Sequence, residues 1–257
     1  MTPKKTAKKP PASPTKSQTS SVTKSFEGHL RELYNRFAVV AIIFVLACIV
    51  GYVFREQLQT FLLQPLNNQA LVYTSPAGGL NFVIKICLLF GFLVSLPLLI
   101  YQVLAYIKPA HEVINQRLVI TTFIASSLLA FCGVVFAYFI ILPASLNFLE
   151  QFASDSIQSL ITTDEYISFV LLYICGLAAI FQLPLIMTLV GKIGGITAGK
   201  LLRLSGYMIL VSFIFGAIIT PTPDPINQGL IAGPTILLYF VGVTCVYLVN
   251  RSSTKLS

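Results

Sequence analysis

The sequence is poor in the residues that most metal centres and catalytic sites need. It contains no tryptophan and only two histidines, His29 and His111, and only 10% of its 257 residues are charged. The stretch HEVIN that begins at His111 lacks the second histidine of the H-E-x-x-H zinc motif. Two histidines are too few for a zinc hydrolase of the usual kind. The sequence therefore predicts no metal site and no cofactor.

The cysteines are too scattered to build a framework. The chain has five, each in a different apolar run and none in a C-x-x-C pair. Neither a disulfide framework nor a structural zinc site is indicated by this spacing. We interpret them as small apolar side chains that fill space between helices. They are Cys48, Cys87, Cys132, Cys175 and Cys245.

A credible nucleotide site is also missing. The segment GGITAGK, from Gly194 to Lys200, satisfies G-x-x-x-x-G-K. A phosphate loop needs Ser or Thr next, to bind magnesium, and it follows a strand; here Leu201 follows and a long apolar run precedes. We interpret the segment as a glycine-rich turn. No pairing of a nucleophile with a base stands out elsewhere, so an enzyme is not predicted.

Long apolar runs, by contrast, dominate the chain. Its residues are 56% hydrophobic and its mean hydropathy is +0.83, far above an ordinary soluble domain. A helix needs about 20 apolar residues to cross a bilayer, and these runs are too long for barrel strands. We predict an all-α polytopic membrane protein with six transmembrane helices, the last two short, some of them bent by proline. The spans are Phe37–Phe54, Ile86–Ile107, Leu118–Leu142, Tyr166–Gly191, Leu204–Thr220 and Gly229–Val249.

The basic residues predict the orientation. With the N-terminus inside, all of the 17 Lys and Arg residues except Arg55 and Lys85 fall in inner segments. Inner loops of membrane proteins carry such an excess, so both termini are predicted to be cytoplasmic. The formal net charge of +8 is thus a topology signal. Nucleic-acid binding is a poor alternative, because the basic tail has no interleaved aromatic residues.

The chain divides into three parts. Residues 1–24 form a basic cytoplasmic tail, rich in Lys, Pro and Ser, that we expect to be disordered. Residues 25–250 form the six-helix domain, and residues 251–257 a short cytoplasmic C-terminal tail. The first apolar run is a full span, which argues against a cleaved signal peptide. The outer loops are expected at about Arg55–Leu80, Pro143–Glu165 and Thr220–Gln228.

Ionisable residues gather in SFEGHLRELYNRF, residues 25–37, just before the first span. On a helix, His29, Glu32 and Arg36 lie at i, i+3 and i+7 and share one face. Apolar residues share another face with the same spacing, namely Phe26, Leu30, Leu33 and Phe37. The pattern predicts an amphipathic helix that places a carboxylate at the inner membrane surface. It fits either an interfacial anchor with a Glu32–Arg36 pair or a binding site.

Several motifs resemble the TatC family, the core receptor of the twin-arginine protein translocase. HLRELYNRF is similar to its H-L-x-E-L-R-x-R-L signature, and the segment from Ser75 to Ala110 resembles S-P, F-x-x-x-I-K and L-P-x-x-x-Y-Q-x-x-x-F-x-x-P. Three later segments resemble the family as well. The end of span 3 in the family is similar to FAYFIILPASLNFL, and its F-[EQ]-x-P motif in span 4 is similar to FQLPLIM. The last outer turn is similar to TPTPDPINQ. The resemblance runs in order from Phe26 to Val249 and agrees with the six-span topology.

The resemblance implies a receptor without enzymatic activity. The family binds signal peptides with two adjacent arginines, at an inner-surface patch formed by the N-terminal segment and the first inner loop. It recruits single-span TatA/TatB-type subunits and exports folded proteins with the proton-motive force. The expected location is the cytoplasmic (inner) membrane of a bacterium, or the equivalent membrane of a bacterium-derived organelle. Membrane lipids are further expected partners, nucleic acid is not, and self-association stays open.

The resemblance also implies roles for the charged residues of this patch. Glu32 matches the family glutamate that binds the peptide, and a guanidinium prefers a planar carboxylate partner. His29 and Arg36 match too and are expected to orient the segment. Two positions depart from the pattern: Tyr34 replaces an arginine, and Asn115 replaces the first-loop glutamate. We hypothesise that Glu112, three residues earlier, supplies the missing carboxylate.

The remaining candidates lie in or beside the spans. Gln182 occupies the family's polar intramembrane position, where it either makes an internal hydrogen bond or contacts a partner subunit. Lys85 is expected to have a structural role, and Pro97 and Pro184 are expected to bend their helices. Asp224, between two prolines, is expected to begin a helix. The spans otherwise contain almost no ionisable residues, which argues against a small-solute transporter as well as an intramembrane enzyme.

Overall fold

The computed structural model describes residues 17–66, 71–110, 114–151, 161–220 and 224–254, and of residues 17–30, 110 and 252–254 it describes the backbone only. The described chain is helical. The described ranges contain no β-strand, and Val72 and Thr162 form an isolated β-bridge between two connecting segments. The sequence prediction of an all-α fold is therefore confirmed.

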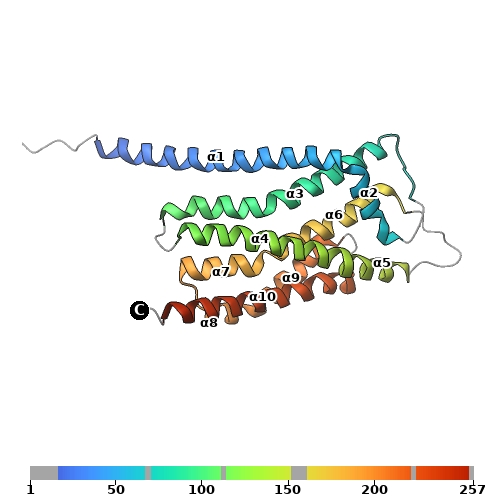
Figure 1. The fold of residues 1–257 in the computed structure, drawn as a ribbon. Coiled ribbons are helices and arrows are strands. Elements are labelled where there is room, and N and C mark those ends of the chain that lie inside the picture. Colours follow the sequence, from blue (N-terminus) through green and yellow to red (C-terminus); the bar gives the residue numbers. More distant parts are fainter. Residues whose placement is uncertain (1–16, 67–70, 111–113, 152–160, 221–223, 255–257) are drawn as a thin grey trace, which may run out of the picture.

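Figure 1 shows long helices lying side by side in a bundle, with α1 at one edge and α10 at the other. The last part of the segment predicted to lack structure is helical, because α1 begins at Ser17. The α-helices are α1 (Ser17–Val53), α2 (Arg55–Leu63), α3 (Gly78–Ile107), α4 (Gln116–Phe136), α5 (Leu142–Glu150), α6 (Thr163–Ile180), α7 (Leu183–Gly194), α8 (Ala198–Arg203), α9 (Ser205–Ile219) and α10 (Pro225–Thr254). Three short elements join them: the 3-10 helices η1 (Gln64–Leu66) and η2 (Lys108–Ala110) and the π-helix η3 (Ala137–Ile141).

Five helical stretches are long and apolar enough to cross a membrane. They are Arg31–Val53, Gly78–Ile107, Gln116–Glu150, Thr163–Gly194 and Pro225–Arg251. The sixth apolar helix, α9, has 15 residues. At 1.5 Å per residue it is about 22 Å long, less than the roughly 30 Å of a hydrocarbon core. The short length of α9 agrees with the prediction that the fifth apolar segment is short, whereas the prediction of a short last span is wrong, since α10 has 30 residues.

The loops predicted at one end of the bundle are partly helical. The segment from Arg55 to Leu80 contains α2 and the start of α3. The segment predicted as a loop from Pro143 is instead helical as far as Glu150, in α5, with Pro143 as the second residue of that helix. The π-helix η3 lets the chain pass from α4 into α5 without a break.

Prolines lie where the long helices change direction. Pro97 is inside α3, and α3 is visibly bent in Figure 1. A proline inside a helix removes one backbone hydrogen bond and crowds the preceding turn, which bends the helix. Pro184 lies instead in the first turn of α7, directly after α6 ends at Ile180. The fourth predicted span is therefore two helices, joined at Phe181 and Gln182.

The core of the bundle surrounds α6. Val170, Tyr173 and Leu177 of α6 are completely buried, among side chains from α2, α3, α5, α9 and α10. Small residues let helices come close: a Cβ added to Gly133 of α4 would lie 2.9 Å from the Cα of Ala178 in α6. In contrast, α1 packs on α3 and is otherwise exposed, with 11% of its most apolar window buried against 50% for α6 and α7.

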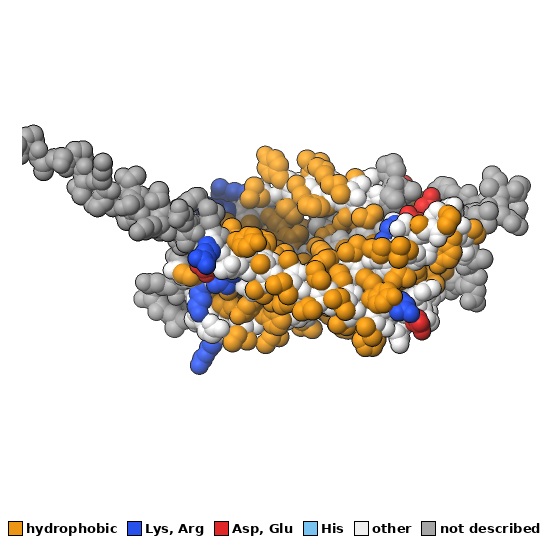
Figure 2. All heavy atoms as spheres, turned by 90° about the horizontal axis from the view of Figure 1, so that it is seen from above, with side chains coloured by type: hydrophobic (Ala, Val, Ile, Leu, Met, Phe, Trp, Pro, Cys, Tyr) orange, Lys and Arg blue, Asp and Glu red, His pale blue; other side chains and the backbone are white. Residues whose placement is uncertain are grey.

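The two ends of the bundle differ in charge. We call basal the end where α10 finishes, where α3 meets α4, and where α1 carries Glu32; the distal end carries α2, α5 and the start of α6 (Figure 1). Figure 2 shows apolar side chains covering the middle of the molecule, with basic side chains gathered at the basal end. Among the described side chains at that end, Glu32 is the one carboxylate. The basic residues there are Arg31, Arg36, Lys108, Arg117, Lys192, Lys200, Arg203 and Arg251.

Candidate functional site

Glu32 and Arg36 form an ion pair on the basal part of α1. The Arg36 Nε donates to Glu32 Oε1 over 3.0 Å, and Arg36 Nη2 donates to the same oxygen over 2.8 Å. The pair spans one helical turn, as the i, i+4 spacing predicts. Both side chains keep contact with solvent, with exposed fractions of 38% for Glu32 and 27% for Arg36. The carboxylate is therefore held in place without being sealed off.

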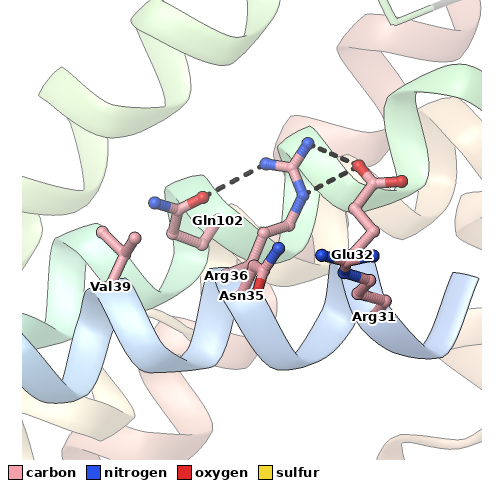
Figure 3. A pocket seen from close by; sticks show the side chains of 6 residues that line it. All are labelled: Arg31, Glu32, Asn35, Arg36, Val39 and Gln102. Carbon is pink, nitrogen blue, oxygen red and sulfur yellow. Dashed lines mark hydrogen bonds and ion pairs between the residues drawn. The ribbon is translucent and has the colours of Figure 1, made fainter. Parts of the chain in front are cut away.

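A third residue joins this pair from another helix. Gln102 lies on α3, and its Oε1 accepts a hydrogen bond from Arg36 Nη1 over 3.2 Å. Figure 3 shows Arg36 between the two, with Gln102 on one side of the guanidinium and Glu32 on the other. Sequence reasoning did not select Gln102 as a site residue. The available signal was its position in the Tyr-Gln pair of the span 2 motif, in an otherwise apolar run.

These residues line an open pocket with a volume of about 520 Å³. Its walls come from the basal part of α1 and from α3, and its polar groups are two guanidinium groups, one carboxylate and two amides. The carboxylate can bind a cationic group and the guanidinium groups can bind carbonyl or anionic groups, in both cases through charge-assisted hydrogen bonds, which are the stronger ones. Its lining residues are Arg31, Glu32, Asn35, Arg36, Val39 and Gln102 (Figure 3).

An apolar groove adjoins the polar pocket. It has a volume of about 260 Å³ and lies between α1 and α3, sharing Arg36 and Gln102 with the pocket. The other lining residues are apolar or aromatic, namely Leu33, Phe37, Val40, Leu99, Val103, Tyr106 and Ile107. A charged and an apolar binding surface therefore meet at the same two side chains.

The other residues predicted for the patch are placed less directly. His29 lies in α1, one turn before Glu32, and the structure describes its backbone but not its side chain. Glu112 lies outside the described residues. Asn115 is the N-cap of α4, where its Oδ1 accepts a hydrogen bond from the backbone N–H of Leu118 over 2.8 Å. Its side-chain oxygen thus stabilises a helix start, a local role that the sequence prediction missed.

Tyr34, where the motif resemblance led us to expect an arginine, is 74% exposed and is not among the residues that line the pocket. A residue two positions after Glu32 on a helix points to a different face, which accounts for this separation. The arginine that does contact the carboxylate is Arg36, one turn further along α1.

Gln182 is bonded within the chain. It is 1% exposed, at the junction of α6 and α7. Ser126 Oγ on α4 donates to Gln182 Oε1 over 2.8 Å. Gln182 Nε2 donates to the carbonyl oxygens of Ser126 and Ala178, over 3.2 and 3.3 Å. Of the two alternatives open from the sequence, the structure contains the internal hydrogen bond.

The last two candidates lie at the distal end. Lys85 Nζ of α3 contacts Asp164 Oδ1 over 2.6 Å and donates to Ser168 Oγ over 2.7 Å, which ties α3 to α6. Asp224 precedes α10, and its Oδ1 accepts a hydrogen bond from the backbone N–H of Asn227 over 2.7 Å. Both residues thus make structural contacts far from the basal pocket. Within the described residues, no three His, Cys, Asp or Glu side chains are grouped as metal ligands would be.

Comparison with known proteins gives one consistent result. The family model for the Sec-independent protein translocase protein (TatC) matches residues 28–234. The Sec-independent protein translocase protein TatC of Synechocystis sp. is 31% identical over 233 residues, covering 90% of this chain and 91% of the relative. The chloroplastic protein TATC of Arabidopsis thaliana is 31% identical over 226 residues, covering 87% and 66%.

A solved structure matches as well. The crystal structure of a twin arginine translocase receptor, TatC, superposes with a TM-score of 0.75 at 33% sequence identity. The match covers 87% of this chain and 100% of the solved one. Sequence and fold therefore point to the same family over most of the chain.

Proposed function

The chain belongs to the TatC family and is therefore a transport component of a Sec-independent protein translocase rather than an enzyme; we propose that it is the receptor that binds twin-arginine signal peptides at its basal pocket. In this proposal a folded precursor presents its two arginines to Glu32. Single-span TatA/TatB-type subunits then assemble on the chain, and the proton-motive force drives export. Membrane lipids surround the apolar helices.

One observation carries the proposal: Glu32 is an accessible carboxylate that already accepts two N–H bonds from a guanidinium. It is the one described carboxylate side chain at a basic end of the bundle, so it is the natural partner there for an incoming arginine. The adjoining apolar groove offers a surface for the apolar part of such a peptide. His29 and Arg36 complete the proposed binding face on α1.

Topology supports the same proposal. The start of α1 and the end of α10 lie at the same end of the bundle (Figure 1), as six crossings require. The basal end carries the basic excess that marks the inner side of a membrane. We therefore propose six spans, with α9 as the short one and both termini in the cytoplasm. The membrane is the inner membrane of a bacterium or its equivalent in a derived organelle, in keeping with relatives of both origins.

The test is peptide binding to the purified chain in lipid nanodiscs. A peptide with two adjacent arginines is expected to bind about tenfold more tightly than its twin-lysine counterpart, about 1.4 kcal/mol. Glu32→Gln is expected to abolish this preference. The matched control is Glu56→Gln, which changes an exposed glutamate of α2 at the distal end. Equal binding of both peptides to the wild-type chain would contradict the receptor proposal.

A second carboxylate is proposed at Glu112. Asn115, at the position of the family's loop glutamate, is neutral and caps α4. Glu112 lies three residues earlier and outside the described residues, so its place near the pocket is a hypothesis from spacing. Glu112→Gln is expected to weaken twin-arginine binding. Binding as tight as that of the wild-type chain would remove Glu112 from the site.

A further inference from the structure

We propose that Gln102 and Arg36 are positioning residues that hold Glu32 in the orientation needed to select arginine over lysine. The proposal deepens the receptor function and rests on it. Gln102 accepts a hydrogen bond from Arg36, and Arg36 forms an ion pair with Glu32. The three side chains therefore connect α3 to the carboxylate through a row of hydrogen bonds. We call this set the carboxylate clamp.

The first link is that Arg36 occupies only one of the two carboxylate oxygens of Glu32. Its Nε and Nη2 both donate to the same oxygen, Oε1 of Glu32. Among the described residues, no hydrogen bond reaches Oε2, and Figure 3 shows that oxygen pointing away from Arg36. An ionised carboxylate can accept about four hydrogen bonds. Oε2 therefore keeps acceptor capacity for a second guanidinium, so a peptide arginine binds beside Arg36 rather than in its place.

The second link is the anchor on α3. An exposed i, i+4 ion pair is worth only about 0.3–0.5 kcal/mol and does not by itself fix a long side chain. Gln102 accepts from Nη1 on the other side of the guanidinium, over 3.2 Å and from a residue 66 positions away. With both sides held, the planar guanidinium has one orientation, and its two donors hold Oε1 of Glu32 in place, which restricts the positions open to Oε2. The tie to α3 also fixes the basal part of α1 relative to α3.

The third link connects orientation to selectivity. A guanidinium donates through a rigid planar fork and needs a carboxylate oxygen at a defined angle. An ammonium group is a compact point charge with rotatable donors, and it tolerates many orientations. Loosening the clamp is therefore expected to weaken binding of arginine while leaving binding of lysine almost unchanged. The ratio of the arginine affinity to the lysine affinity therefore reports on the orientation of the Glu32 carboxylate. A general loss of structure would instead lower both affinities.

The experiment compares Gln102→Leu with Gln102→Glu in nanodiscs, with the twin-arginine and twin-lysine peptides as probes. Leucine removes the acceptor but fits the apolar groove that Gln102 also lines. Glutamate keeps an acceptor for Arg36. We expect Gln102→Leu to reduce the arginine preference from about tenfold to below about threefold, with lysine affinity within about twofold of wild type. Gln102→Glu should keep the wild-type preference.

Two further variants serve as controls. One tests whether the planar shape of the Arg36 side chain matters beyond its positive charge, and the other tests whether any exposed Gln→Leu change alters peptide binding. Arg36→Lys keeps the positive charge, but one ammonium group cannot reproduce the planar bridge between Gln102 and Glu32, so it should behave like Gln102→Leu. Gln57→Leu makes the same chemical change at an exposed position of α2 and should behave like the wild-type chain.

The outcomes distinguish the two proposals. If the wild-type chain prefers arginine and Gln102→Leu keeps that preference, the carboxylate clamp is wrong and the receptor function stands. If Gln102→Leu weakens both peptides equally, Gln102 has a merely structural role and the clamp is again wrong. If the wild-type chain itself shows no preference, the receptor function fails, and the clamp fails with it.

Discussion

Two groups of polar side chains in this bundle have opposite surroundings. At the basal end of α1 and α3, Arg36 donates hydrogen bonds to both Glu32 and Gln102 beside an open pocket. In the middle of the bundle, Gln182 and Ser126 are also bonded to one another, but they are 1% and 0% exposed. Both groups are held by hydrogen bonds between helices, but Glu32 keeps one carboxylate oxygen without a hydrogen bond among the described residues. They differ in whether anything else can reach them.

The difference follows from the helices that carry them. The pair α6 and α7 lies in the core, where a buried polar group must have a partner because leaving it unpaired is costly. In contrast, α1 packs on α3 alone for most of its length and remains largely exposed. Polar groups between α1 and α3 can therefore accept a further partner, whereas those around Gln182 serve stability. Substitutions should separate the two roles.

The largest expected effect is on packing in the buried region. Gly133→Leu would place a side chain against the backbone of α6, because even a Cβ there lies 2.9 Å from the Cα of Ala178. We expect the free energy of unfolding to fall by about 3 kcal/mol, the upper part of the usual range for overpacking. Thermal unfolding in a mild detergent measures it. Gly206→Leu is the control, since nothing lies within 4 Å of a Cβ built there; equal losses would contradict the close approach of α4 and α6.

A smaller effect is expected at the buried hydrogen bond. Gln182→Leu leaves the Ser126 hydroxyl without its acceptor, which is expected to cost about 1–3 kcal/mol of unfolding free energy. Adding Ser126→Ala removes the stranded donor, so the double variant should be more stable than Gln182→Leu alone. A double-mutant cycle in detergent gives the coupling. Strictly additive effects would mean that the Ser126–Gln182 bond contributes nothing.

The smallest expected change in stability is at the open site. Glu32→Gln breaks a partly exposed i, i+4 ion pair, so we expect the free energy of unfolding to change by no more than about 0.5 kcal/mol. The same variant is expected to lose its preference for the twin-arginine peptide. A large loss of stability in the unfolding experiment would overturn the contrast, because it would make Glu32 a structural residue like Gln182.

Some features could be predicted because they depend on residues close in sequence. The all-helical class follows from apolar runs of bilayer length, since a backbone in hydrocarbon must satisfy its own hydrogen bonds. The Glu32–Arg36 pair follows from a spacing of four on a helix. The length of α10 and the helical nature of α2 and α5 were missed. For α10 the predicted loop included Pro225, which a helix accommodates in its first turn; for α2 and α5 the predicted loops covered residues that are helical.

The sequence by itself determined the class of the chain, its charged basal segment and the residue that we propose to bind arginine. Only the tertiary structure decided which polar groups meet across helices. Gln102 lies 66 positions from Arg36, and Ser126 lies 56 from Gln182. Helical periodicity predicts neighbours within one helix, but it does not give the rotation or depth at which two helices pack. Those depend on close contacts such as the one between Gly133 and Ala178, which bring distant parts of the chain together.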